Sequence, residues 1–201
     1  MGFNLGILIS GRGSNMLNIV NASQTGLISS KVKIVISNNK NSDGIEKAKK
    51  KKEKKKKVKT KVLIQNKYNS KKDFEIDLNN KLEKENVDLI CLAGFMTILS
   101  KYFLEKWKNK IINIHPSLLP KFRGKDAVKK ALESKIKTSG CTVHFVDEGI
   151  DTGKIIDQEK VLVSNDDDEE TLAKKILKKE HILYIRVIKE LERMHHNVKI
   201  S

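Results

Sequence analysis

The chain of 201 residues has only two cysteines, two prolines and 5% aromatic residues, and these low contents exclude several classes of protein and site. Cys91 and Cys141 both lie within apolar segments, so we interpret them as reduced, buried residues rather than as a disulfide or a metal pair. The five histidines form no ligand set, and the sequence predicts no metal site. No run of about eighteen apolar residues is present, so we expect no membrane-spanning helix.

Arginine is also scarce, although the net charge is +16. Eleven of the fifteen residues from Lys47 to Lys61 are lysine, whereas the whole chain has four arginines. Proteins that read bases or bind single strands rely on arginine forks and aromatic platforms. An AT-rich genome produces the same lysine-rich composition, so we expect no nucleic-acid partner, with a polyanion-binding segment as the alternative. The run itself is expected to be a frayed, solvated helix or loop, because like charges at i,i+4 oppose helix formation.

Apolar segments alternate with helix-like segments, which predicts an α/β fold with a mostly parallel twisted sheet and helices on both faces. A hydrophobic content of 38% suits one compact domain over residues 1–201. The first residues carry no basic n-region and are expected to form a strand rather than a signal peptide. The expected strands cover 5–10, 32–37, 62–64, 87–92, 111–114, 143–146 and 155–163. The expected helices cover 15–23, 44–57, 72–85 and 101–108, with a last amphipathic helix after the acidic run 166–170.

Both prolines follow an apolar run that ends in Asn113-Ile114-His115. Pro116 and Pro120 end the strand and set a rigid turn, because proline fixes φ and lacks a backbone donor. Asn113 and His115 are two positions apart, so their side chains leave the same side of an extended segment. Strand ends face the ligand crevice of open α/β sheets, and we therefore predict a functional site here. A buried structural histidine is the alternative.

A glycine-rich turn, Gly11-Arg12-Gly13-Ser14-Asn15, follows the first expected strand. Glycines allow a ligand to approach the backbone closely, and free N–H groups at a helix start attract phosphate. The turn lacks the third glycine and the downstream acidic residue of a dinucleotide site, and it is not a P-loop. The alternative is a tight turn in which Ser14 or Asn15 caps the helix.

Two further residues are open to more than one interpretation. Asp151 lies in a glycine-flanked loop, where it either shapes an Asx-turn or, if the loop folds near His115, orients the imidazole and favours its protonated form. His144 lies in the middle of an expected strand, where a structural or supporting role is favoured over catalysis.

Five motifs in order resemble those of the phosphoribosylglycinamide formyltransferases, a folate-dependent family, and they span nearly the whole chain. They are Ser-Gly-Arg-Gly-Ser-Asn at 10–15, Leu-Ala-Gly-Phe-Met-Thr-Ile-Leu at 92–99, Asn-Ile-His-Pro-Ser-Leu-Leu-Pro-Lys-Phe at 113–122, Val-His-Phe-Val at 143–146 and Asp-x-Gly at 151–153. The resemblance implies a Rossmann-like formyltransferase fold. It also implies transfer of a formyl group from 10-formyltetrahydrofolate to the glycine amine of glycinamide ribonucleotide, in cytoplasmic purine synthesis, by a monomer or homodimer that needs no metal.

The resemblance assigns roles residue by residue. It makes Asn113, His115 and Asp151 the catalytic trio, and it implies a cis Leu119–Pro120 bond. The substrate phosphate would rest on Gly13, Ser14 and Asn15, and Glu180 would contact the ribonucleotide. The folate would contact Lys71, Met96, Thr97, Ile98, Leu99 and Asn113. The family often has arginine at the positions of Thr97 and Lys71, which changes the charge or the hydrogen-bonding fork near the folate.

Two relatives that share this fold are the alternatives. Methionyl-tRNA formyltransferases usually have alanine after the motif histidine and add a C-terminal tRNA-binding domain, whereas this chain has Pro116 and no such domain is expected. Formyltetrahydrofolate hydrolases carry an N-terminal regulatory domain, whereas here the first strand is expected to begin within five residues of the start.

The implied reaction is consistent with the chemistry of the three residues. An amine that attacks a formyl carbon builds negative charge on the formyl oxygen, which an asparagine amide and a protonated histidine can hold. A proton must also pass from the amine to the departing folate nitrogen, which suits a group that titrates near neutral pH. The aspartate is expected to raise the pKa of His115 and to order a water for that transfer.

Overall fold

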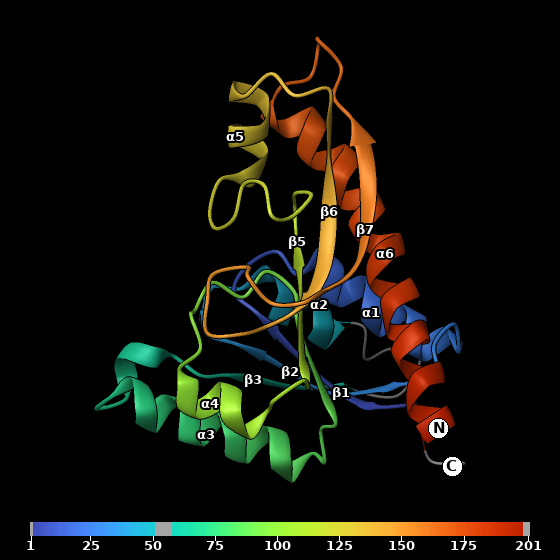
Figure 1. The fold of residues 1–201 in the computed structure, drawn as a ribbon. Helices are drawn as coiled ribbons and strands as arrows, with labels where there is room; N and C mark the ends of the chain where they lie inside the picture. The colour runs from blue at the N-terminus through green and yellow to red at the C-terminus, as the bar shows by residue number, and fades with distance from the viewer. Residues whose placement is uncertain (1, 51–57, 199–201) are drawn as a thin grey trace.

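The computed structural model describes residues 2–50 and 58–198, whose strands form one seven-stranded sheet (Figure 1). The strands are β1 (Asn4–Ile9), β2 (Lys31–Ser37), β3 (Lys59–Val62), β4 (Leu89–Leu92), β5 (Ile111–His115), β6 (Thr138–Phe145) and β7 (Ile155–Leu162). The helices are α1 (Ser14–Thr25), α2 (Asp43–Lys50), α3 (Lys71–Lys84), α4 (Lys101–Lys106), α5 (Ala127–Glu133), α6 (Glu169–Val198) and the short 3-10 helix η2 (Gln65–Lys67).

The strand order is β3-β2-β1-β4-β5-β6-β7, and the first five strands are parallel. Strands β6 and β7 run antiparallel to their neighbours. The chain moves outward from β1 to β3 and then returns to β4 on the other side of β1. Ligands of open α/β sheets bind where the order reverses in this way, at the carboxyl ends of the strands. The loops that follow β1 and β4 therefore meet at the expected position of a site.

Two apolar cores cover the two faces of the sheet, as alternation along β1 requires. Leu5, Ile7 and Ile9 point to the face packed against α1 and α6, whereas Leu8 points to the face packed against α3 and α4. Figure 1 shows α3 and α4 together on one side of the sheet and α1, α2 and α6 on the other. The expected mostly parallel sheet with helices on both faces is confirmed.

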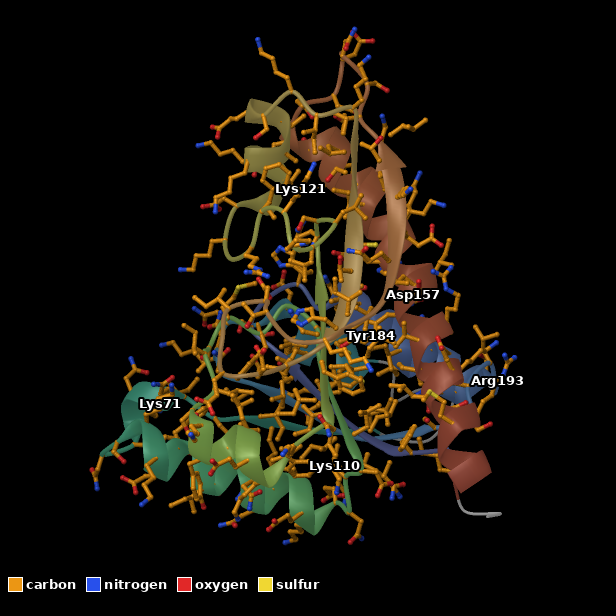
Figure 2. The ribbon with its side chains drawn as sticks, in the orientation of Figure 1. Lys71, Lys110, Lys121, Asp157, Tyr184 and Arg193 are labelled. Atoms are coloured by element: carbon orange, nitrogen blue, oxygen red, sulfur yellow. The ribbon has the colours of Figure 1, made fainter. Side chains whose placement is uncertain are left out.

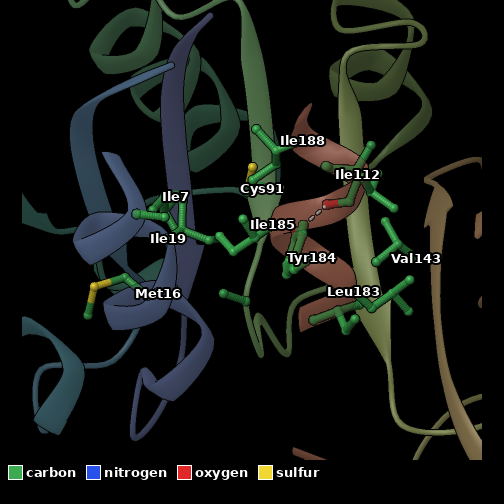
Figure 3. Close-up of a cluster of buried hydrophobic side chains, with 14 of the residues drawn as sticks. Ile7, Met16, Ile19, Cys91, Ile112, Val143, Leu183, Tyr184, Ile185 and Ile188 are labelled. Atoms are coloured by element: carbon green, nitrogen blue, oxygen red, sulfur yellow. Dashed lines mark hydrogen bonds between the residues drawn. The ribbon is translucent and has the colours of Figure 1, made fainter. Parts of the chain in front are cut away.

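Tyr184 on α6 ties this helix to the strands that carry the site. Its side chain is fully buried, and its hydroxyl lies 2.9 Å from the carbonyl oxygen of Leu92. The hydroxyl also lies 3.1 Å from the carbonyl oxygen of Ile112 (Figure 3). Burial raises the pKa of the phenol well above its ordinary value, so the group stays protonated. The hydroxyl thus bridges the last residue of β4 and the residue that precedes Asn113 in β5.

The expected elements differ from the structure where a segment has no apolar run. Strand β3 covers Lys59–Val62 rather than 62–64, because an edge strand can be built from exposed lysines that give no apolar signal. Helix α5 was not expected from the sequence, since only Ala127 and Ala131 among its residues are buried. Strand β6 begins at Thr138 rather than at 143. The expected extension of α2 to residue 57 lies outside the described residues.

One further expectation is confirmed. The Leu119–Pro120 peptide bond is cis. Within residues 2–50 and 58–198, no helix is long and apolar enough to cross a membrane.

Candidate active site

The end of β5 and the loop between β6 and β7 bring Asn113, His115 and Asp151 together. The Nδ1 atom of His115 lies 3.1 Å from Oδ2 of Asp151, and the Nδ2 atom of Asn113 lies 3.4 Å from Oδ1 of Asp151. Asp151 adopts a left-handed backbone conformation with φ of 52°, which asparagine and aspartate tolerate better than most residues. Its Oδ2 also accepts the N–H of Gly124 at 2.9 Å. Of the two interpretations of Asp151, the structure supports the one that places it beside His115.

The imidazole of His115 is buried between two oxygen acceptors. Besides its contact with Asp151, its Nε2 lies 2.8 Å from the carbonyl oxygen of Phe122. Burial lowers the pKa of His115 below its ordinary value, although the Phe122 carbonyl and the Asp151 carboxylate both act to raise it. The expected effect of Asp151 therefore has the right sign, and the larger effect of burial on the pKa of His115 is an addition to it. A neutral imidazole can donate from only one nitrogen, whereas both nitrogens of His115 face oxygen acceptors, and an oxyanion developing beside the ring would favour the protonated form.

The carboxyl group of Asp151 stays ionised in this setting. Burial by itself raises its pKa, but hydrogen bonds with His144 and the Gly124 N–H, together with the nearby His115, lower the pKa below its ordinary value. The site therefore holds a carboxylate whose charge is directed at a buried imidazole.

His144 completes the cluster, although the sequence did not predict it as a site residue. Its Nε2 lies 3.4 Å from Oδ1 of Asp151 and 3.3 Å from Nδ2 of Asn113, while its Nδ1 lies 2.8 Å from the carbonyl oxygen of Phe145. His144 stands directly opposite Asn113 in the antiparallel pairing of β5 with β6. This register could not be read from the sequence. The supporting role favoured for His144 agrees with its position.

The glycine-rich turn leads into α1 without a capping side chain. Gly13 has φ of 70°, the helix begins at Ser14, and no hydrogen bond from a side chain caps its start among the described residues. The alternative in which Ser14 or Asn15 caps the helix is therefore not observed. The N–H groups at this helix start remain available to an anion.

Asn15 instead contacts Glu180, so the structure joins two of the predicted ribonucleotide contacts. The amide Nδ2 of Asn15 donates to Oε2 of Glu180 at 2.8 Å, linking α1 with α6. Burial raises the pKa of Glu180, and the hydrogen bond from Asn15 opposes that increase only in part. Oδ1 of Asn15 is buried and has no hydrogen-bond partner in the described part of the chain. This group remains available to a ligand donor.

The loop after β4, which contains the predicted folate contacts Met96 to Leu99, is attached to the loop after β1. The N–H of Ser10 donates to the carbonyl of Gly94 at 2.9 Å, and its Oγ accepts the N–H of Met96 at 2.8 Å. Met96 and Ile98 are 69% and 62% exposed, so their side chains are available to a ligand.

Three other predicted folate contacts differ in their surroundings. The hydroxyl of Thr97 accepts a hydrogen bond from Nδ2 of Asn38 at 2.6 Å. Leu99 is 6% exposed and packs in the core under α3 and α4, so only its backbone remains for a ligand. Lys71 is the exposed first residue of α3 (Figure 2), and no hydrogen bond or ion pair joins it to the rest of the site among the described residues.

Comparison with known sequences agrees with this arrangement. The formyl transferase family matches residues 3–188. The phosphoribosylglycinamide formyltransferase of Escherichia coli (strain K12) is 36% identical over 185 residues, which cover 92% of this chain and 85% of that protein. The trifunctional purine biosynthetic protein adenosine-3 of Chironomus tentans is 44% identical over 188 residues, which cover 92% of this chain but only 13% of that protein. The chain thus spans a small part of the trifunctional relatives.

Solved structures share the fold over almost the whole chain. Glycinamide ribonucleotide transformylase 1 from Symbiobacterium toebii has a TM-score of 0.90 and 38% identity, covering 96% of this chain and 88% of that one. The enzyme of the same name from Geobacillus kaustophilus has a TM-score of 0.89 and 35% identity, covering 96% of this chain and 100% of that one. The chain belongs to the formyl transferase family.

Proposed function

We propose that the protein transfers a formyl group from 10-formyltetrahydrofolate to the glycine amine of glycinamide ribonucleotide, a step of de novo purine (IMP) synthesis. One observation carries the proposal: Asn113 and His115 at the end of β5 converge on Asp151 at 3.4 Å and 3.1 Å. Relatives named for this reaction cover most of this chain and most of their own length.

The proposed chemistry is direct attack of the amine on the formyl carbon. The amide of Asn113 and the imidazole of His115 would hold the negative charge that develops on the formyl oxygen. The contacts of Asn113 Nδ2 at 3.3 Å and 3.4 Å are longer than ordinary hydrogen bonds, so exchanging them for a formyl oxygen costs little. His115 Nε2 is hydrogen-bonded to Phe122 O, so the proposal requires the formyl oxygen to replace that carbonyl as the acceptor.

The proton of the attacking amine must reach the departing folate nitrogen. Asp151 is held ionised beside His115, so it is suited to order a water that passes this proton. The substrate phosphate is proposed to rest on the N–H groups of residues 13–15, with Glu180 as a further contact to the ribonucleotide. The folate is proposed to lie against residues 96–99 and Asn113, with Lys71 near its charged end.

The setting of the enzyme is part of the same proposal. Cys91 and Cys141 are free and buried, which supports a reducing compartment such as the cytoplasm. We propose a single domain over residues 1–201 that acts as a monomer or a homodimer.

A spectroscopic assay of 10-formyltetrahydrofolate consumption tests the proposal. Three reactions are compared: with glycinamide ribonucleotide, with methionyl-tRNA, and with no acceptor. We expect consumption only with the ribonucleotide. Consumption only with methionyl-tRNA, or equal consumption without an acceptor, would contradict the proposal and favour one of the two relatives instead.

A further inference from the structure

The glycine-rich loop between β1 and α1 is held from one side by residues 39–47, which connect β2 with the first turn of α2. Three successive carbonyl oxygens of the loop each accept from a donor in residues 39–47. These are Ser10 O from Asn39 Nδ2 (3.1 Å), Gly11 O from Ser42 Oγ (2.9 Å) and Gly44 N (3.1 Å), and Arg12 O from Lys47 Nζ (3.3 Å).

These contacts set the direction of the N–H groups of the loop. In a trans peptide the carbonyl of one residue and the N–H of the next lie in one plane and point in opposite directions. Because the carbonyls of Gly11 and Arg12 face residues 39–47, the N–H groups of Arg12 and Gly13 point away from that segment. An array of backbone N–H groups with a common direction is an anion-binding arrangement.

The glycine-rich loop and residues 39–47 pack too closely at Gly13 and Gly44 to admit a side chain at either position. A Cβ added to Gly44 would lie 2.6 Å from Cδ1 of Ile9 and 3.0 Å from the carbonyl oxygen of Gly11. A Cβ added to Gly13 would lie 2.8 Å from Cα of Gly44. The position of the loop is therefore determined by residues 39–47 as well as by its own glycines.

The side chain of Lys47 contacts the glycine-rich loop. It is exposed, yet its ammonium donates to the Arg12 carbonyl, whereas the nearby Lys49 pairs with Glu46 at 2.7 Å on the same helix. We propose that Lys47 is a positioning residue of the phosphate loop. It holds the Arg12 carbonyl so that the loop N–H groups face the substrate phosphate, and it adds positive charge beside them. This inference rests on the proposed function.

Steady-state kinetics of Lys47→Met, Lys47→Arg and Lys49→Met test the inference. Lys47→Met keeps the length of the side chain but removes the charged donor, and we expect the KM for the ribonucleotide to rise about tenfold. The kcat and the KM for the folate should stay within about twofold, because the loop does not touch the reacting atoms. Lys47→Arg should restore most of the ribonucleotide affinity, and Lys49→Met should behave as the wild type.

Several results would overturn the inference. These are an unchanged ribonucleotide KM in Lys47→Met, an equal change in Lys49→Met, or equal losses for both substrates. Calorimetric titration with ribose 5-phosphate tests the role of Lys47 separately from the proposed function. Equal affinity of the wild type and Lys47→Met for ribose 5-phosphate would overturn the role of Lys47 whatever the activity. The other case is that Lys47→Met binds ribose 5-phosphate more weakly than the wild type, while the wild type formylates no ribonucleotide. That pair of results would support the role of Lys47 and overturn only the proposed function.

Discussion

Oδ2 of Asp151 lies 3.1 Å from Nδ1 of His115 and accepts the N–H of Gly124 at the same time. The loop between β6 and β7 is thereby fastened both to the end of β5 and to the turn that follows the two prolines. The carboxylate is 13% exposed, so little water screens its charge from the imidazole. A residue that only shaped its own turn would not need either contact.

Replacing this carboxylate should affect the rate far more than binding. We expect Asp151→Asn to lower kcat by about 10²–10⁴, the usual contribution of a general acid or base, with little change in ribonucleotide affinity. Asp151 raises the pKa of His115, while burial already lowers it. Removing the charge should therefore lower the pKa of His115 further and move the corresponding limb of the pH–rate profile to lower pH. Unchanged activity, or a limb that stays in place, would mean that Asp151 is only a turn residue.

Asn113 and His115 should act as a unit. Each of Asn113→Ala and His115→Ala is expected to lower kcat by roughly 10²–10³, because each removes one donor to the developing oxyanion. The double variant should lose less than the product of the two single losses. A double-mutant cycle in kcat/KM measures this coupling. Strictly multiplicative losses would show that the two side chains do not share one oxygen.

The sequence predicted the elements that consist of apolar runs and failed for those built from polar or small residues. Strands β1, β2 and β5 are apolar runs, because both faces of a parallel sheet are covered. Strand β3 consists of Lys59, Thr60, Lys61 and Val62 at the edge, and pairing with β2 rather than composition makes it a strand.

Site residues that lie on one short segment were predicted from the sequence. Features of the site that depend on strand pairing or on burial were missed. Asn113 and His115 lie on one strand end, so spacing alone places them together. The position of His144 depends on the register of β5 with β6. The lowered pKa of His115 depends on how deeply the fold buries it, and a sequence does not state that depth. The role proposed for Lys47 was also hidden, because its contact with the Arg12 carbonyl depends on the fold and nothing in the sequence separates it from the other lysines of the run.

The conformation of Gly13 leads to a prediction with a matched control. Gly13 and Gly26 both have positive φ, at 70° and 77°, so alanine costs roughly 1–2 kcal/mol of stability at either position. At Gly13 the new Cβ would also meet Cα of Gly44 at 2.8 Å, whereas at Gly26 nothing lies within 4 Å. We expect both variants to lower Tm but only Gly13→Ala to raise the KM for the ribonucleotide, with the folate KM nearly unchanged. Equal effects of Gly13→Ala on both substrates would contradict the phosphate assignment.

The Glu180 carboxyl group should strengthen ribonucleotide binding but lower the stability of the folded protein. Its pKa is raised by burial, so the folded state favours the protonated acid and loses stability as pH rises from the ordinary carboxyl range through the raised value. Glu180→Gln cannot ionise, and its oxygen can still accept the Asn15 amide. Its Tm should therefore match that of the wild type near pH 4 and exceed it at pH 8. An increase of roughly 2–4 °C is what about 1 kcal/mol gives a chain of this size.

The same substitution should weaken ribonucleotide binding, because a neutral amide replaces a carboxylate beside Asn15. Glu192→Gln is the control: Glu192 is also buried on α6, but it accepts the N–H of Ser30 at 2.6 Å, away from the glycine-rich loop. It should leave the ribonucleotide KM unchanged. Thermal unfolding across pH and a ribonucleotide titration check both effects of Glu180→Gln. A Tm difference that does not depend on pH would contradict the buried, raised-pKa carboxyl. An unchanged ribonucleotide KM would mean that Glu180 only joins α6 to α1 through Asn15.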